Sequence, residues 1–187
     1  FVKYFSQRRS VKTVLYFLYF CCIINKIGEL PIMKVIGLCG VSGSGKGYVA
    51  SLFATYSIAS IDTDAIYREL VSGHSDCMAE LIAEFGKGIV TPDGALDREA
   101  MRGLVFSGEH AEANRARLNE ISHRHVLSEV RRKISELNKS DVTAVLVDAP
   151  LLFESGFDKE CDFIICVVAP VEIRVQRIID RDRIKRE

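Results

Sequence analysis

The stretch GVSGSGKG, from Gly40 to Gly47, has the residue types and the spacing of a phosphate-binding loop. It fits the pattern G-x-x-x-x-G-K-[ST] at Gly40, Gly45 and Lys46. Glycines between a strand and a helix let backbone N–H groups point at phosphate oxygens, and the lysine adds a positive charge at the β- and γ-phosphates. We therefore expect an ATP site; the alternative is a glycine-rich turn that binds no nucleotide. The expected ATP contacts are Gly43, Ser44, Gly45, Lys46, Gly47 and Tyr48.

Gly47 departs from this pattern, because a Ser or Thr hydroxyl normally follows the lysine and binds Mg²⁺. Mg²⁺ keeps several waters and relies on substrate phosphates, so a water can replace the missing hydroxyl. Glycine also weakens the first turn of the helix, by up to about 1 kcal/mol relative to Ala. We expect impaired metal positioning more than loss of nucleotide binding. The alternative is a sequence error or a degraded gene copy.

Two carboxylates, Asp62 and Asp64, follow a predicted strand over 57–62. In open α/β sheets, ligands bind beyond the carboxyl ends of the strands. Phosphoryl transfer to an alcohol needs a carboxylate that orients the hydroxyl and takes its proton. Asp62 and Asp64 are therefore candidates for substrate binding, with Asp62 also a candidate for the metal. A helix N-cap, which Asp64 could serve equally well, remains the alternative.

Asp148 ends the hydrophobic run AVLVD and is the second candidate metal ligand, in an arrangement similar to a Walker B strand. A strand that happens to end in Asp is the alternative. The chain then leaves the sheet toward the same edge, so we expect Leu151 and Glu154 to contact the substrate. His123, in a long predicted helix, is a further candidate whose partner the sequence does not identify.

Arginines crowd the end of the chain, and the last helix contains Arg174, Arg177, Arg181, Arg183 and Arg186. A positively charged lid that closes on the triphosphate would stabilise the charge that develops during transfer. For any single arginine the alternative is a solvated helix face.

The elements that must position these residues alternate between strands and helices. Apolar runs predict strands over 33–40, 57–62, 142–150 and 163–169. Helical patterns cover 48–56, 65–71, 76–86, 98–106, 109–137 and 171–187, with Asp97 as an expected N-cap. The long helix places Leu118, Ile121, Val130, Ile134 and Leu137 near one face.

This order predicts an α/β fold with a mainly parallel sheet. The helical stretch between the second and third strands is too long for one crossover. We therefore expect an inserted helical subdomain that covers the substrate.

Composition sets the remaining limits. A length of 187 residues predicts one domain, and 25 basic against 25 acidic side chains give no general reason to expect nucleic acid or a membrane as a partner. The six cysteines show no metal-binding spacing, and a core of this size needs no disulfides. Because Cys39 and Cys166 lie in predicted buried strands, we expect free thiols and a cytoplasmic protein.

Residues 1–32 form a predicted N-terminal extension, with the domain proper over 33–187. Basic residues precede an apolar run from Val14 to Ile24 that is too short for a comfortable membrane span. Met33 begins the first predicted strand. A membrane-anchoring segment is the alternative for this extension.

Taken together, the motifs resemble the dephospho-CoA kinase family from Met33 to the end of the chain. The stretches that carry the resemblance are VIGLCGVSGSGKG, IDTDAIYREL, TPDGALDREAMRGLVF, LNEISHRHV, VDAPLLFESGFD and RVQRIIDRD. The resemblance implies a three-layer P-loop kinase fold with a short basic lid. It also implies transfer of the γ-phosphoryl of ATP to the ribose 3′-hydroxyl of dephospho-CoA, the last step of coenzyme A synthesis, with Mg²⁺. By the same resemblance Asp64 is the catalytic base, Lys46 the P-loop lysine and Arg181 a lid arginine.

Three features depart from the family pattern. Gly47 and Tyr48 replace Ser-Thr after the lysine, and Arg124 replaces a proline after the motif histidine, His123. The family's chain also continues beyond residue 187, so we expect the C-terminal part of the domain to be missing. Two alternatives stay open: another small P-loop kinase that acts on a nucleoside or sugar, and a non-catalytic nucleotide-binding remnant.

Overall fold

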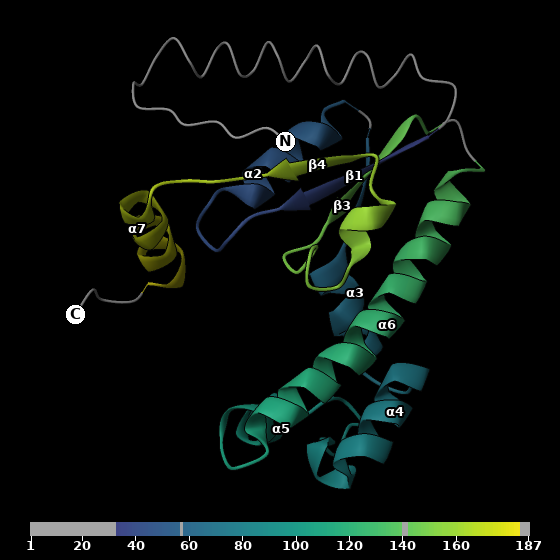
Figure 1. Ribbon diagram of the computed structural model, residues 1–187, viewed down its shortest axis with the longest axis vertical. Helices are drawn as coiled ribbons and strands as arrows, with labels where there is room; N and C mark the ends of the chain where they lie inside the picture. The colour runs from purple at the N-terminus through teal and green to yellow at the C-terminus, as the bar shows by residue number, and fades with distance from the viewer. Residues whose placement is uncertain (1–32, 57, 140–141, 184–187) are drawn as a thin grey trace. The chain divides into compact units, whose positions relative to one another are not determined.

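One sheet organises the part of the chain that carries the glycine loop (Figure 1). The computed structural model describes residues 33–56, 58–139 and 142–183. Its strands lie in the order β2-β3-β1-β4, and β1 pairs in parallel with both β3 and β4. The strands are β1 (Lys34–Cys39), β2 (Ala59–Asp62), β3 (Ala144–Asp148) and β4 (Phe163–Cys166). This is the expected α/β fold with a parallel sheet.

The two faces of the sheet are covered by different segments. Helix α2 (Lys46–Ala54) packs on one face, where Phe53 joins Ile36 and Leu38 of β1 in a buried cluster. Because side chains alternate along a strand, Gly37 faces the other way. A Cβ on Gly37 would lie 2.9 Å from Leu152 Cδ2, so the segment after β3 packs tightly on this second face. That segment continues into η2 (Phe157–Glu160), and α7 (Val171–Asp182) follows β4.

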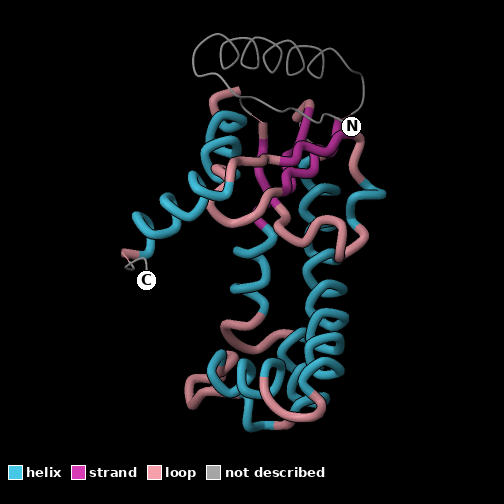
Figure 2. Tube along the Cα trace, turned by 60° about the vertical axis from the view of Figure 1, so that its left-hand side comes forward, coloured by secondary structure: helices cyan, strands magenta, loops and turns pink. Residues whose placement is uncertain are grey.

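Residues 62–133 form a second compact unit, which is helical and is inserted between β2 and β3 in the sequence (Figure 2). Its elements are α3 (Thr63–Leu70), α4 (Asp76–Phe85), η1 (Lys87–Ile89), α5 (Arg98–Phe106) and most of α6 (Ala111–Leu137). Their apolar faces share a buried cluster of Val71, Cys77, Met78, Leu81, Ile89, Leu96, Met101, Val105 and Ile121. A single crossover helix between β2 and β3 therefore does not account for the length of this segment.

Most predicted elements are confirmed within a few residues, and β4 is the main exception. Only Phe163–Cys166 of the predicted strand over 163–169 is a strand, and Cys166 is exposed. The prediction that Cys166 is buried was wrong because β4 lies at the edge of the sheet. All four cysteines among the described residues are free: Cys39, Cys77, Cys161 and Cys166.

Some predictions fall outside the described residues. These are the N-terminal extension over 1–32, with Cys21 and Cys22, and the last residues of the C-terminal helix, 184–187. Among the described helices, none combines the length and the apolar character that a membrane span requires.

Candidate active site

The glycine loop connects the end of β1 to the start of α2, as the sequence predicts. Gly43 has a φ of 76°, in the left-handed region that favours glycine. A Cβ there would also lie 2.5 Å from the carbonyl oxygen of Arg174. Backbone conformation and close packing therefore both require glycine at this position.

The N-terminus of α2 is open to an anion. Gly45 is its N-cap residue and supplies no side-chain hydrogen bond, and the first turn contains no acidic residue. The first N–H groups of a helix have no partners within the helix, and the helix dipole places partial positive charge there. Such a terminus is suited to a phosphate group.

Lys46 and Asp148, which the sequence analysis selected separately, form an ion pair beside the loop. Asp148 is the last residue of β3, the strand that pairs with β1. The register between these two strands places the Asp148 carboxylate next to Lys46. The two side chains are only 18% and 14% exposed, so the pair is largely shielded from water.

A magnesium ion fits this arrangement only with help from the nucleotide. Mg²⁺ is commonly held by one or two carboxylates together with phosphates and waters. Asp148 offers one carboxylate at the loop, and, beyond the neighbouring backbone of α2, no atom of the described residues lies within 4 Å of a Cβ built on Gly47, which leaves room for a water. Within the described ranges no group of three or more His, Cys, Asp or Glu side chains could hold a metal. The residues present thus suit a metal bound mainly through phosphates.

Ser44 carries a buried hydroxyl within the loop. The residue is 5% exposed, and its Oγ has no hydrogen-bond partner among the described residues. Most buried polar groups in proteins are paired, so an unpaired one marks a place where a ligand or water would be accommodated.

Two arginines of α7 reach the loop. Arg174 Nε donates to the carbonyl oxygen of Ser42 at 3.1 Å, and Arg177 Nη1 donates to those of Gly43 and Ser44 at 3.1 and 2.9 Å. Arg181, the arginine chosen from the sequence, bonds Asp182 at 2.7 Å. Arg174 and Arg177 were not among the residues predicted from the sequence to bind ATP, although their three-residue spacing places them on one helix face.

The structure shows which of Asp62 and Asp64 caps the helix that follows β2. Asp62 ends β2 and is the N-cap of α3, since its Oδ1 accepts from the N–H groups of Asp64 and Ala65 at 2.8 and 3.0 Å. The capping residue is therefore Asp62 and not Asp64. The exposed carboxylate of Asp64 has no hydrogen-bond partner among the described residues, which leaves it available for proton transfer.

Leu151 and Glu154 lie exposed on the segment that follows β3. The intervening Leu152 is fully buried against β1 and anchors this segment to the sheet. Its neighbours Leu151 and Phe153 consequently turn outward and are 48% and 57% exposed.

Comparison with known proteins identifies the family. The family model for dephospho-CoA kinase matches residues 34–187, most of the chain. The chain belongs to the dephospho-CoA kinase family. It is 35% identical over 153 residues to a dephospho-CoA kinase of Moorella thermoacetica, which covers 81% of this chain and 71% of that protein. It is 38% identical over 146 residues to one of Thermobifida fusca, with coverages of 78% and 70%.

Two solved structures are similar to this chain in fold. The crystal structure of TT1252 from Thermus thermophilus superposes with a TM-score of 0.66 at 30% identity and covers 82% of this chain and 75% of that one. The dephospho-CoA kinase from Campylobacter jejuni, at 19% identity, has a TM-score of 0.59 with the same coverages and supports the fold alone.

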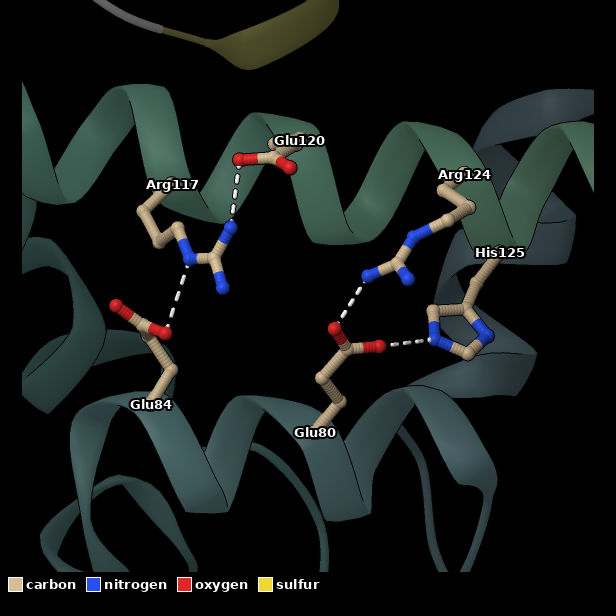
Figure 3. A network of polar contacts seen from close by, with 6 residues as sticks. All are labelled: Glu80, Glu84, Arg117, Glu120, Arg124 and His125. Atoms are coloured by element: carbon tan, nitrogen blue, oxygen red, sulfur yellow. Dashed lines mark hydrogen bonds and ion pairs between the residues drawn. The ribbon is translucent and has the colours of Figure 1, made fainter.

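Arg124, the predicted departure from the family pattern, takes part in an ion pair between two helices. It forms an ion pair with Glu80 of α4, and His125 Nε2 lies 2.8 Å from the other carboxylate oxygen of Glu80 (Figure 3). The hydrogen bonds from His125 and Arg124 lower the pKa of the Glu80 carboxyl. His123 lies half-buried on the same helix, α6. Arg124 also keeps a backbone N–H at this point of the helix, which proline lacks.

Proposed function

We propose that this protein transfers the γ-phosphoryl group of ATP to the ribose 3′-hydroxyl of dephospho-CoA, the last step of coenzyme A biosynthesis. The observation that carries this proposal is the pairing of Lys46 with Asp148 beside the open glycine loop, in a chain of the dephospho-CoA kinase family.

The glycine loop would bind the triphosphate of ATP. Backbone N–H groups and the N-terminus of α2 favour the phosphates, and Lys46 would neutralise charge at the β- and γ-positions. Asp148 would hold Mg²⁺, with Asp62 as the second candidate. When bound there, Mg²⁺ would supply positive charge that offsets the negative charge of the phosphates. The proposed ATP contacts are Gly43, Ser44, Gly45, Lys46, Gly47, Tyr48 and Arg181.

Asp64 would act as the general base. Its carboxylate would accept the proton of the ribose 3′-hydroxyl while that oxygen bonds the γ-phosphorus, and ADP would leave with the electrons of the broken P–O bond. The exposed, unbonded state of this carboxylate supports the role. The proposed substrate contacts are Asp62, Asp64, His123, Leu151 and Glu154.

The substitution Asp64→Asn tests this proposal. A general base contributes roughly 10²–10⁴-fold to the rate, so we expect a fall of that size in kcat, with the Kd for ATP unchanged. The matched control is Asp76→Asn, which alters another exposed first-turn aspartate and should leave both values unchanged. Near-normal turnover of Asp64→Asn would remove Asp64 from the mechanism.

The acceptor is tested separately. ADP release is measured for the unmodified protein with dephospho-CoA and with a panel of nucleosides and sugars. We expect ADP release that depends on dephospho-CoA. Faster turnover of another acceptor would favour a different small kinase, and ATP binding without turnover at any Mg²⁺ concentration would favour a non-catalytic remnant.

A further inference from the structure

The start of α7 lies directly against the glycine loop. A Cβ on Gly43 would lie 2.5 Å from the carbonyl oxygen of Arg174 and 2.9 Å from its Cα. The Arg174 side chain adds a hydrogen bond to the carbonyl oxygen of Ser42 at 3.1 Å. Backbone packing and a side-chain bond thus fix the two segments to each other.

Arg177, one turn further along α7, bonds two consecutive carbonyl groups of the loop. Its Nη1 lies 3.1 Å from the oxygen of Gly43 and 2.9 Å from that of Ser44. In a planar trans peptide the C=O and the following N–H point in opposite directions. With the Ser44 carbonyl held toward Arg177, the N–H of Gly45 is directed away from it.

This orientation matters for an anion site. A phosphate is attracted by N–H groups and repelled by carbonyl oxygens. A loop that binds phosphate must therefore turn its carbonyls outward, and an arginine on the outer side stabilises that state.

We propose that Arg177 is a positioning residue of the nucleotide site, which orients the glycine loop through the carbonyls of Gly43 and Ser44 and does not itself bind the nucleotide. The inference rests on the proposed function, in which this loop binds ATP. Arginine suits the role because its planar guanidinium presents several donors in a fixed geometry, whereas the lysine ammonium is a compact, hydrated point charge.

Arg177→Lys and Arg177→Ala separate this role from a direct contact with phosphate. A lysine retains the charge that would bind a phosphate, but its ammonium lacks the planar geometry that directs the N–H groups of Arg177 Nη1 at the two carbonyls. We expect both variants to weaken ATP and ADP binding to a similar extent, by about 5- to 30-fold, which corresponds to the loss of one or two hydrogen bonds of about 1 kcal/mol each. The KM for ATP should rise by the same factor, while kcat changes less than threefold.

The matched control is Gln176→Ala on the same helix, because the partner of the Gln176 side chain among the described residues is Asp180, at 2.8 Å, and not the loop. This variant should bind both nucleotides as the unmodified protein does. A purely structural role for Arg177 would lower the unfolding temperature and the active fraction and leave KM unchanged, which would overturn the proposal.

Other outcomes also decide the question. Near-normal binding by Arg177→Lys, with weak binding by Arg177→Ala, would show that the charge contacts phosphate. Loss of ATP affinity without loss of ADP affinity would indicate a γ-phosphate contact. Normal nucleotide binding by both variants would refute the positioning role alone. If the unmodified protein bound neither nucleotide, the proposed function would fail instead.

Discussion

Gly47 follows the lysine of the glycine loop, and its surroundings accept a side chain. Beyond the neighbouring backbone of α2, no atom of the described residues lies within 4 Å of a Cβ built there, and the backbone of Gly47 is not in the left-handed region. The absence of a hydroxyl is therefore not imposed by packing. The effect of the missing hydroxyl on the proposed reaction depends on how well a water molecule replaces it as a metal ligand.

We predict that Gly47→Ser lowers the Mg²⁺ concentration needed for half-maximal activity. The serine hydroxyl would replace a water as metal ligand, with a gain of roughly 1–3 kcal/mol, the scale of a hydrogen bond to a charged group. The measurement is a magnesium titration of ADP formation. Gly47→Ala is the matched control, because it improves the helix by up to about 1 kcal/mol without adding a hydroxyl. Identical titrations for the serine and alanine variants would show that the hydroxyl has no role.

At the scale of elements, the sequence predicts the strands and caps well where the signal is local. The buried runs of β1 and β3 and the capping of α5 by Asp97 are confirmed. The order of strands in a sheet depends on contacts between segments that are distant in the sequence. An apolar run therefore could not predict that β4 is an edge strand and that Cys166 on it is exposed. The set of residues that meet at the candidate site depends on such distant contacts in the same way. Glycine spacing predicts the loop, but which arginines of α7 reach it depends on packing between distant segments.

Helices α4 and α6 are joined by the network that Figure 3 shows. Glu80 bonds both Arg124 and His125, and Arg117 bonds Glu84 at 2.9 Å and Glu120 at 2.7 Å. The pKa of Glu80 is lowered from 4.5, chiefly by the hydrogen bond to His125 and then by that to Arg124. A carboxyl whose pKa is lower in the folded state than in the unfolded state stabilises the protein at neutral pH.

We predict that Glu80→Gln destabilises the protein at pH 7 and that the difference from the unmodified protein shrinks in acid. The unfolded state binds the proton more tightly, so the contribution of Glu80 is complete above 4.5 and is lost as the pH falls through its folded value. Urea unfolding of both proteins between pH 7 and about pH 3 measures this difference. Glu112→Gln, outside the network, reports the general effect of removing one surface acid. A difference for Glu80→Gln that does not vary with pH would contradict the prediction.

On the scale of the whole molecule, the similarity to dephospho-CoA kinases extends over both compact units, since the family model matches residues 34–187. Each unit nevertheless has its own buried cluster. Leu146 of β3 belongs to the cluster beneath α2, and Leu81 of α4 belongs to that of the helical unit. Both leucines are fully buried. Local stability in proteins often varies between such contiguous units.

We predict that Leu81→Ala and Leu146→Ala, which remove equal side-chain volumes, destabilise different parts of the chain. Each should cost about 2–5 kcal/mol through lost burial and the cavity left behind. Amide hydrogen exchange under native conditions locates the effect. Leu81→Ala should accelerate exchange in α4 and α5 more than in β1 and β3, because its lost contacts lie within the helical cluster, and Leu146→Ala should do the reverse. Equal acceleration throughout by both variants would show that the two units open only together, so that the separate clusters do not act as separate units of stability.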